Sequence, residues 1–337
     1  MSLLILPVSG FITCAIIIFF AGRKLSEYGD LLAEKAGWGK AWVGLILMAS
    51  VTSLPELMVG LSSSAIVESA DLAVGDILGS CAFNLCILAL MDAFVPRHKA
   101  LFSLASQSHV LSAALGIILI GLAGFSLFLP EEIVISTWIG TTSILFIIIY
   151  LLSIRLLYKN EQKNRHVTPQ LPIEGDIRNQ ITMRRVSAMY SLFAVIIILA
   201  ALALPYFAED IAEAAGLNKS FVGTLFLATS TSLPELAVSI AAIRMGSIDL
   251  AVGGLLGSNI FNILILALDD IFYTKGHLMK DASDINVLSV FAAIIMSAIV
   301  IIGLNYRASG KRFFLAWDAA LIFLIYVLNI ILLYRLS

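Results

Sequence analysis

The chain has 337 residues, of which 60% are hydrophobic and only 13% are charged, and its formal net charge is −2. Soluble domains are about 25% charged, so this composition excludes an ordinary soluble protein. It predicts an all-α polytopic membrane protein, whose constant partner is the lipid bilayer. The nearly balanced charge gives no indication of a nucleic-acid partner.

Apolar runs recur along the whole chain. A helix rises about 1.5 Å per residue, so roughly 20 apolar residues cross a hydrocarbon core of about 30 Å. Ten runs reach this length and predict ten transmembrane helices, at about 3–22, 42–66, 71–94, 106–128, 133–154, 187–207, 220–243, 249–272, 285–304 and 314–334.

Lysine and arginine divide unequally between the two sides of this arrangement. Of the 21 basic residues, one side receives all but four, which are Lys219, Lys275, Lys280 and Arg335. Because basic segments stay in the cytoplasm, we expect both termini to be extracellular in a multi-pass protein of the plasma membrane. The stretch 155–186 is then a cytoplasmic linker between two halves, 1–154 and 187–337.

The chain contains an internal duplication. Residues 33–57 align without gaps with 212–236, an offset of 179, and the apolar run from Asp71 aligns with that from Asp249, an offset of 178. Each half holds five predicted helices, an odd number, so the halves should lie upside down relative to each other. This arrangement predicts two inverted five-helix repeats, the plan of secondary transporters.

The phrase Thr-Ser-Leu-Pro-Glu occurs at 52–56 and again at 231–235, inside apolar runs of membrane length. An acid at the centre of such a helix costs roughly 2.5–3.5 kcal/mol, so Glu56 and Glu235 indicate an ion site. Pro55 and Pro234 cannot donate to the carbonyls one turn earlier, which frees backbone oxygens. Carboxylate, hydroxyl and carbonyl oxygens together suit hard cations such as Ca²⁺ and Na⁺. A proline kink beside a neutral glutamic acid is the alternative.

A second shared block should supply the neighbouring helix. Gly75 and Gly79, like Gly253 and Gly257, have the GxxxG spacing that lets helices approach closely. Ser80 and Ser258 follow, and one turn later come Asn84 and Asn262. Cys14, Cys81 and Cys86 lack the spacing of a disulfide framework or zinc site and are interpreted as packing residues.

These paired motifs, over 49–91 and 228–269, resemble the α-repeats of the cation/Ca²⁺ antiporter superfamily, most closely its prokaryotic sodium/calcium exchangers. The resemblance implies that Glu56 and Glu235 are the central ligands of the transported ions. It also implies that the first and sixth helices slide or gate. The other implied ligands are Thr52, Ser53, Ser80 and Asn84, then Thr231, Ser232, Ser258 and Asn262, and the carbonyls of Ala49 and Ala228.

The chain departs from the family pattern at three places. Val51 and Ser230 stand where glycine is usual before Thr-Ser. Asp76 adds an acid whose counterpart is Gly254, and it could tune affinity, bind a proton or face a water-filled entrance. Both halves carry asparagine, at 84 and 262, where some relatives have one aspartate. Two glutamates then give a core charge of about −2, suited to one Ca²⁺ or to two or more Na⁺.

The resemblance therefore implies an antiporter, not an enzyme, that exchanges Ca²⁺ for Na⁺ by alternating access. No cofactor is expected, and the chain lacks a Gly-x-x-x-x-Gly-Lys-Ser/Thr phrase, so ATP is not expected to drive it. A proton-coupled Ca²⁺ exchanger and, more distantly, a cation channel remain alternatives. A membrane hydrolase could use His109 as a base, but the sequence offers this residue no evident partner. The counter-ion, stoichiometry and oligomeric state stay open.

Overall fold

The computed structural model describes residues 2–35, 52–129, 139–164, 182–244, 246–308, 310–311 and 314–336, and within these ranges every regular element is a helix. The helices are α1 (Ser2–Lys35), α4 (Leu54–Ala65), α5 (Ala70–Asp92), α6 (Leu101–Leu104), α7 (His109–Ser126), α8 (Thr141–Asn164), α10 (Met183–Ala215), α11 (Lys219–Val222), the π-helical η3 (Gly223–Leu227), α12 (Ala228–Thr231), α13 (Leu233–Arg244), α14 (Ile248–Phe272), α15 (Leu278–Asp281), the 3₁₀ turn η4 (Asp284–Asn286), α16 (Val287–Tyr306) and α17 (Trp317–Leu336).

Eight helices of the described residues are long and apolar enough to cross a membrane, and a bent pair, 219–231 with 233–244, makes a possible ninth. The predicted runs 42–66 and 133–154 lie partly outside the described residues, so ten crossings remain a prediction. The helices extend beyond several predicted runs. In particular, α1 continues past residue 22 to Lys35 and α8 continues past residue 154 to Asn164, because charged residues end an apolar run but readily continue a helix.

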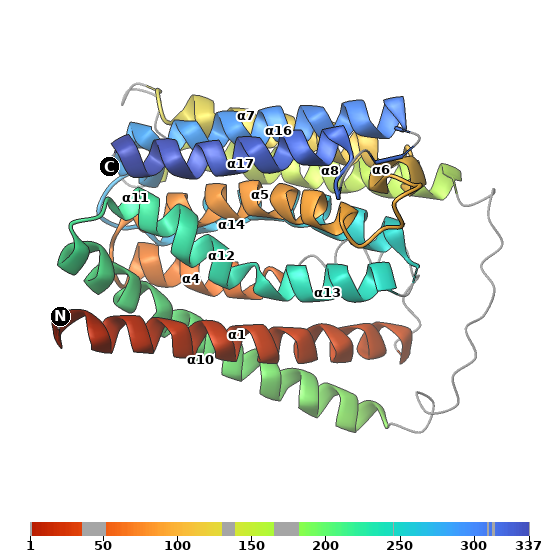
Figure 1. Cartoon of the computed structure of the whole chain (residues 1–337). Helices are drawn as coiled ribbons and strands as arrows, with labels where there is room; N and C mark the ends of the chain where they lie inside the picture. The colour runs from red at the N-terminus through yellow and green to blue at the C-terminus, as the bar shows by residue number, and fades with distance from the viewer. Residues whose placement is uncertain are drawn as a thin grey trace.

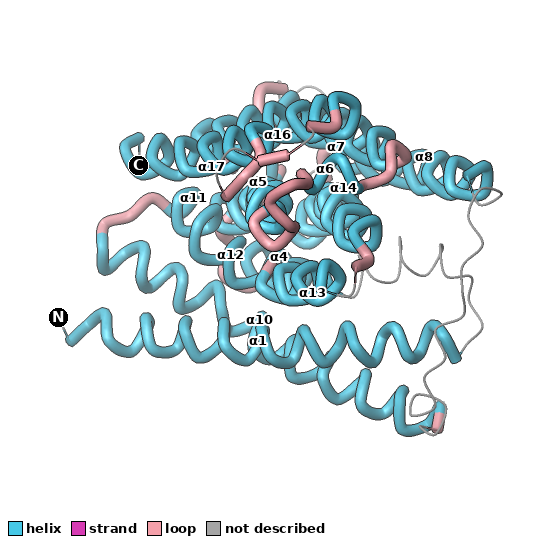
Figure 2. Tube along the Cα trace, turned by 45° about the vertical axis from the view of Figure 1, so that its right-hand side comes forward, coloured by secondary structure: helices cyan, strands magenta, loops and turns pink. Residues whose placement is uncertain are grey.

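The helices form layers around a central pair (Figures 1 and 2). Helices α5 and α14 pack against each other in the middle, with α4 and α13 beside them. Helices α7, α8, α16 and α17 cover one side of this group. On the other side α1 and α10 pack together as an outer pair, with α1 against α13 and α10 against α4. The polar motifs of the two halves therefore come together in the interior.

Glycines allow α5 to approach the second half closely. A Cβ atom added to Gly79 would lie 2.6 Å from the Cα atom of Thr224, and one added to Gly75 would lie 2.9 Å from the carbonyl oxygen of Ser220. Such distances are far below van der Waals contact, so a larger residue would not fit. The predicted close approach is confirmed for Gly75 and Gly79.

Matching aspartates of the two repeats, Asp71 and Asp249, form hydrogen bonds at opposite ends of the molecule. At one end, where α4 leads into α5, Lys275 pairs with Glu68 at 2.6 Å and the Ser283 N–H donates to Asp71. We call this the α4–α5 end; it also holds the C-terminus of α14.

The opposite end, where α13 leads into α14, is called the α13–α14 end. There Asp249, the counterpart of Asp71, accepts hydrogen bonds from the Ser106 N–H at 2.6 Å and pairs with the His109 ring at 3.0 Å. His109 thus has a partner that the sequence did not reveal, and the pair fastens α7 to the start of α14.

Candidate functional site

Both Thr-Ser-Leu-Pro-Glu phrases sit at the start of a helix. Ser53 and Ser232 directly precede α4 and α13, with φ and ψ of −85° and 12° in the first copy and −87° and 9° in the second. In the second copy the axis bends by 44° at this residue. Pro55 and Pro234 lie in the first turn of their helices, where a missing N–H is tolerated. In the second copy the helix is therefore broken at Ser232, two residues before Pro234.

The π-helical turn η3 comes just before this break in the second half. Its residues, Gly223–Leu227, pack on α5 beside Gly75 and Gly79, and the Thr224 hydroxyl donates to the Gly75 carbonyl at 3.2 Å. Single π-helical turns occur mostly where function needs an irregular backbone. The counterpart in the first half lies outside the described residues.

Each glutamate is bound by the serine of the other half. Ser232 Oγ donates to Glu56 Oε1 at 2.8 Å, and Ser53 Oγ donates to Glu235 Oε1 at 3.4 Å. Thr52 also hydrogen-bonds Glu235. Glu56 is fully buried and Glu235 is 3% exposed, so the two carboxylates occupy the interior predicted for them. The arrangement joins the two sequence repeats into one polar centre.

Thr231 connects this centre to α5. Its hydroxyl lies 3.4 Å from Ser80 Oγ, 3.2 Å from Asp76 Oδ1 and 3.2 Å from the Ala228 carbonyl. The Ala228 carbonyl also accepts the Ser232 N–H at 3.1 Å, so an ion bound there would share this oxygen with the helix. Ala49, the matching carbonyl in the first half, lies outside the described residues.

The two asparagines lie between α5 and α14. Asn84 Nδ2 donates to Asn259 Oδ1 at 3.0 Å, and Asn259 Nδ2 donates to the Cys81 carbonyl at 3.0 Å. The Asn262 amide faces the sulfur of Cys81 at 3.9 Å. Asn259 was not singled out from the sequence. Its counterpart at the 178-residue offset is Cys81, so the contact joins matching positions of the two repeats.

Several buried oxygens at this centre have no hydrogen-bond partner. Leaving a buried polar atom unpaired is costly, and such atoms need an explanation. A hard cation would supply one, because it binds oxygen ligands of this kind. The unpartnered atoms are Glu56 Oε2, Glu235 Oε2, Ser258 Oγ, Asn84 Oδ1, Asn262 Oδ1 and Asp76 Oδ2. Among the described residues no three acidic, histidine or cysteine side chains converge on one point, so neutral oxygens have to complete any cation shell here.

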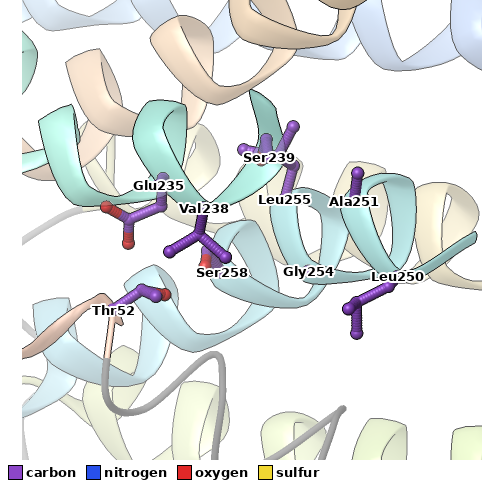
Figure 3. Close-up of a pocket in the computed structure, with 9 residues that line it drawn as sticks. All are labelled: Thr52, Glu235, Val238, Ser239, Leu250, Ala251, Gly254, Leu255 and Ser258. Carbon is purple, nitrogen blue, oxygen red and sulfur yellow. The ribbon is translucent and has the colours of Figure 1, made fainter. Parts of the chain in front are cut away.

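A small cavity opens beside Glu235 toward the α13–α14 end (Figure 3). Its volume is about 20 Å³, enough for one water-sized occupant. Thr52, Glu235 and Ser258 gather at one end of it and Leu250 lies at the other. The remaining lining residues are Val238, Ser239, Ala251, Gly254 and Leu255.

Asp269 is a further buried acid, which was not singled out from the sequence. Asp269 is fully buried near the end of α14, and neither of its carboxylate oxygens has a partner. Its neighbour Asp270 matches Asp92 in the repeat, and both bind backbone N–H groups. Asp269 instead matches Met91 at the 178-residue offset. The sequence did contain one signal for Asp269, because the first copy of the same apolar run has the uncharged Met91 at this position.

A bundle of membrane-length helices, in which the starts of α4 and α13 bring carboxylates and hydroxyls together in the interior, defines a multi-pass membrane protein with a buried oxygen-lined centre. The family model for sodium/calcium exchanger protein matches residues 6–159 and 186–335. The chain therefore belongs to the sodium/calcium exchanger family, a family of transporters and not of catalytic enzymes.

The chain is also similar to individual proteins and to a solved structure. The chain is 28% identical over 260 residues to the inner membrane protein YrbG of Escherichia coli, covering 74% of this chain and 75% of that protein. It is 34% identical over 136 residues to the sodium/calcium exchanger MaX1 of Methanosarcina acetivorans, covering 38% and 36%. The structure of the sodium-calcium exchanger NCX_Mj has the same fold, with a TM-score of 0.63, 21% identity and coverage of 97% and 98%.

Proposed function

We propose that the chain is a secondary active antiporter that exchanges Ca²⁺ for Na⁺ at a site centred on Glu56 and Glu235. The observation that carries this proposal is the reciprocal pairing of each glutamate with the serine of the other half. It leaves one oxygen of each buried carboxylate free for an ion.

The donor set suits these ions in number and chemistry. Two carboxylates neutralise one Ca²⁺ or two Na⁺, and the surrounding hydroxyl, amide and carbonyl oxygens extend the shell toward the 6 to 8 oxygens that Ca²⁺ takes. Mg²⁺ fits less well, because it demands a small octahedral shell and gives up water reluctantly. The ligands are those named from the sequence, and Asn259 adds a polar neighbour that orients Asn84.

Alternating access would operate around this fixed centre. The cavity beside Glu235 extends along α14 toward the α13–α14 end, so ions would reach Glu235 from this end in the present conformation. The outer pair α1 and α10 would slide across the motif helices. Gly22 of α1 lies against the motif proline, since a Cβ atom there would come within 2.4 Å of Pro234 Cγ.

Ten crossings in two inverted repeats, over 1–154 and 187–337 with a cytoplasmic linker at 155–186, fit this function. Helix α1 begins and α17 ends at the same end of the molecule (Figure 1), as an even number of crossings requires. With the basic segments in the cytoplasm, the α4–α5 end would face the exterior of the cell and the α13–α14 end the cytoplasm.

Uptake of ⁴⁵Ca²⁺ into vesicles reconstituted with the purified protein tests this proposal. Vesicles loaded with Na⁺ and diluted into Na⁺-free buffer should accumulate ⁴⁵Ca²⁺, and vesicles with equal Na⁺ on both sides should not. Uptake driven by a pH gradient but not by Na⁺ would assign the chain to proton-coupled exchange instead. No uptake with either gradient would contradict Ca²⁺ exchange altogether.

A further inference from the structure

Asp269, near the end of α14, lies against the helix that carries Glu56 and is not among the proposed ligands of the central site. The clearest mark of its position is Gly60 on α4, one turn beyond Glu56. A Cβ atom added to Gly60 would lie 2.3 Å from Asp269 Oδ2 and 2.6 Å from Oδ1. The carboxylate therefore occupies the space that any larger residue at position 60 would fill, and it is aimed at the backbone of the helix that carries Glu56.

Asp76 approaches the same region from α5. It is fully buried, its Oδ1 atom accepts from Thr231 and its Oδ2 atom has no partner. Thr231 directly precedes Ser232, which donates to Glu56, so Asp76 lies close to the central site. Two acids thus lie next to Glu56 on the side of the α4–α5 end.

The sequence repeat relates this region to the cavity beside Glu235. Glu235, Ser239, Gly254 and Ser258 line that cavity, and their counterparts in the first half are Glu56, Gly60, Asp76 and Ser80. The two places are thus matching positions on opposite sides of the central site. One is an open cavity with glycine at 254, whereas the other has an aspartate at 76 and the Asp269 carboxylate lying against Gly60.

No basic side chain of the described residues pairs with either acid. The ion pairs found at the ends of the molecule involve other acids, among them Asp92 with Lys311 and Glu68 with Lys275. Burying unpaired carboxylates is strongly unfavourable, and a bound cation relieves that cost. The three unpartnered oxygens of Asp269 and Asp76 are the ligands that a hard cation prefers.

We propose that Asp269 and Asp76 form an accessory binding position for a hard cation, Ca²⁺ or Na⁺, between Glu56 and the α4–α5 end. A cation entering from this end meets the accessory position before the central glutamates. Met91 and Gly254, the counterparts of Asp269 and Asp76, carry no charge, so the described residues of the opposite route have no matching pair of acids. The accessory position extends the proposed transport site, but its occupancy can be measured without transport.

Equilibrium binding of ⁴⁵Ca²⁺ to the purified full-length protein tests this inference. The wild type should show a tighter and a weaker component of binding. Asp269→Asn, which keeps the shape of the side chain, should weaken the second component by about tenfold or more, as expected when a ligand charge is removed. Asp284→Asn is the matched control, because Asp284 is an exposed acid near the same end and its removal should change neither component.

A second variant separates geometry from charge. Gly60→Ala keeps every carboxylate but forces that of Asp269 to move, so it should weaken the second component as well. Glu56→Gln should abolish the tighter component and leave the weaker one. If Glu56→Gln has no effect while Asp269→Asn does, the central assignment fails and the accessory position stands.

Sidedness provides an independent readout. In vesicles of defined orientation, Asp269→Asn should raise the Ca²⁺ concentration for half-maximal uptake when Ca²⁺ is added at the α4–α5 end and not when it is added at the other. Wild-type binding by Asp269→Asn, or an equal effect from both sides, would overturn the inference.

Discussion

Ser232 donates a hydrogen bond of 2.8 Å to Glu56, although the two residues are 176 positions apart in the chain. The matching bond, from Ser53 to Glu235, is longer at 3.4 Å. Hydrogen bonds to charged groups contribute about 1.5–3 kcal/mol, more than bonds between neutral groups. The two bonds thus hold the motif helices of the two halves together and set the direction in which each carboxylate points.

Ser232→Ala should therefore weaken Ca²⁺ binding and lower thermal stability, by about 1–2 kcal/mol, because Glu56 loses the one side-chain donor it has among the described residues. Ser53→Ala should have a smaller effect, since the Thr52 hydroxyl also reaches Glu235. Ser9→Ala, at an exposed position of α1, is the control. Thermal unfolding with and without Ca²⁺ measures all three, and equal stabilisation by Ca²⁺ in every variant would argue against the reciprocal bonds.

Glu56→Gln and Glu235→Gln should each abolish exchange. Each substitution removes one of the two charges that neutralise the cation, while glutamine can still accept the serine hydrogen bond and preserve the packing. Initial rates of Na⁺-driven ⁴⁵Ca²⁺ uptake should fall to the level of empty vesicles. Glu213→Gln, on the exposed end of α10, should transport as the wild type does. Substantial exchange by either central variant would remove the proposed site.

Gly79→Ala should destabilise the fold. The added methyl group would lie 2.6 Å from the backbone of Thr224, which cannot give way as a flexible side chain can, and overpacking of this kind costs about 1–3 kcal/mol. Gly116→Ala in α7 is the matched control, because no atom lies within 4 Å of the added methyl group and alanine favours the helix by up to about 1 kcal/mol. Melting temperatures should move in opposite directions for the two variants.

Gly22→Val should slow exchange more than it weakens Ca²⁺ binding. Valine at this position would press on Pro234, where α1 crosses the motif helix, whereas none of the proposed ligands changes. The turnover rate should fall while the equilibrium ⁴⁵Ca²⁺ affinity stays near that of the wild type. Leu6→Val, on the lipid-exposed face of α1, should leave both unchanged. A matched loss of affinity and rate would instead indicate damage to the site itself.

The sequence predicted the elements that repeat, and of the two acids present in only one repeat it singled out Asp76 but not Asp269. The duplicated phrase located the break before α13, and the paired glycines located the close approach of α5. Both predictions follow from strong local rules, namely the missing N–H of proline and the missing side chain of glycine. The site residues assigned by resemblance lie on α4, α5, α12, α13 and α14 or directly before them, apart from Ala49, which lies outside the described residues.

The position of Asp269 could not be predicted from the residues around it in the sequence. Asp269 follows an apolar run and stands next to Asp270, which accepts a backbone N–H, so its neighbours in the sequence assign it no separate role. Its significance depends on Gly60, which is more than 200 positions earlier, and on the absence of the acid in the other repeat. His109 is a similar case, since its partner Asp249 lies 140 positions away. Contacts of this range follow from the tertiary fold and not from spacing along the chain.

The hydrogen bonds from the serine of each half to the glutamate of the other half bear on how such a chain could have arisen. Neither half contains both the carboxylate and the hydroxyl that holds it, so a single unduplicated repeat would have had to associate with a second copy to assemble one site. Once fused, the two copies were free to diverge. Aspartates at 76 and 269 could then arise at the α4–α5 end alone, while the central glutamates and serines stayed the same in both halves.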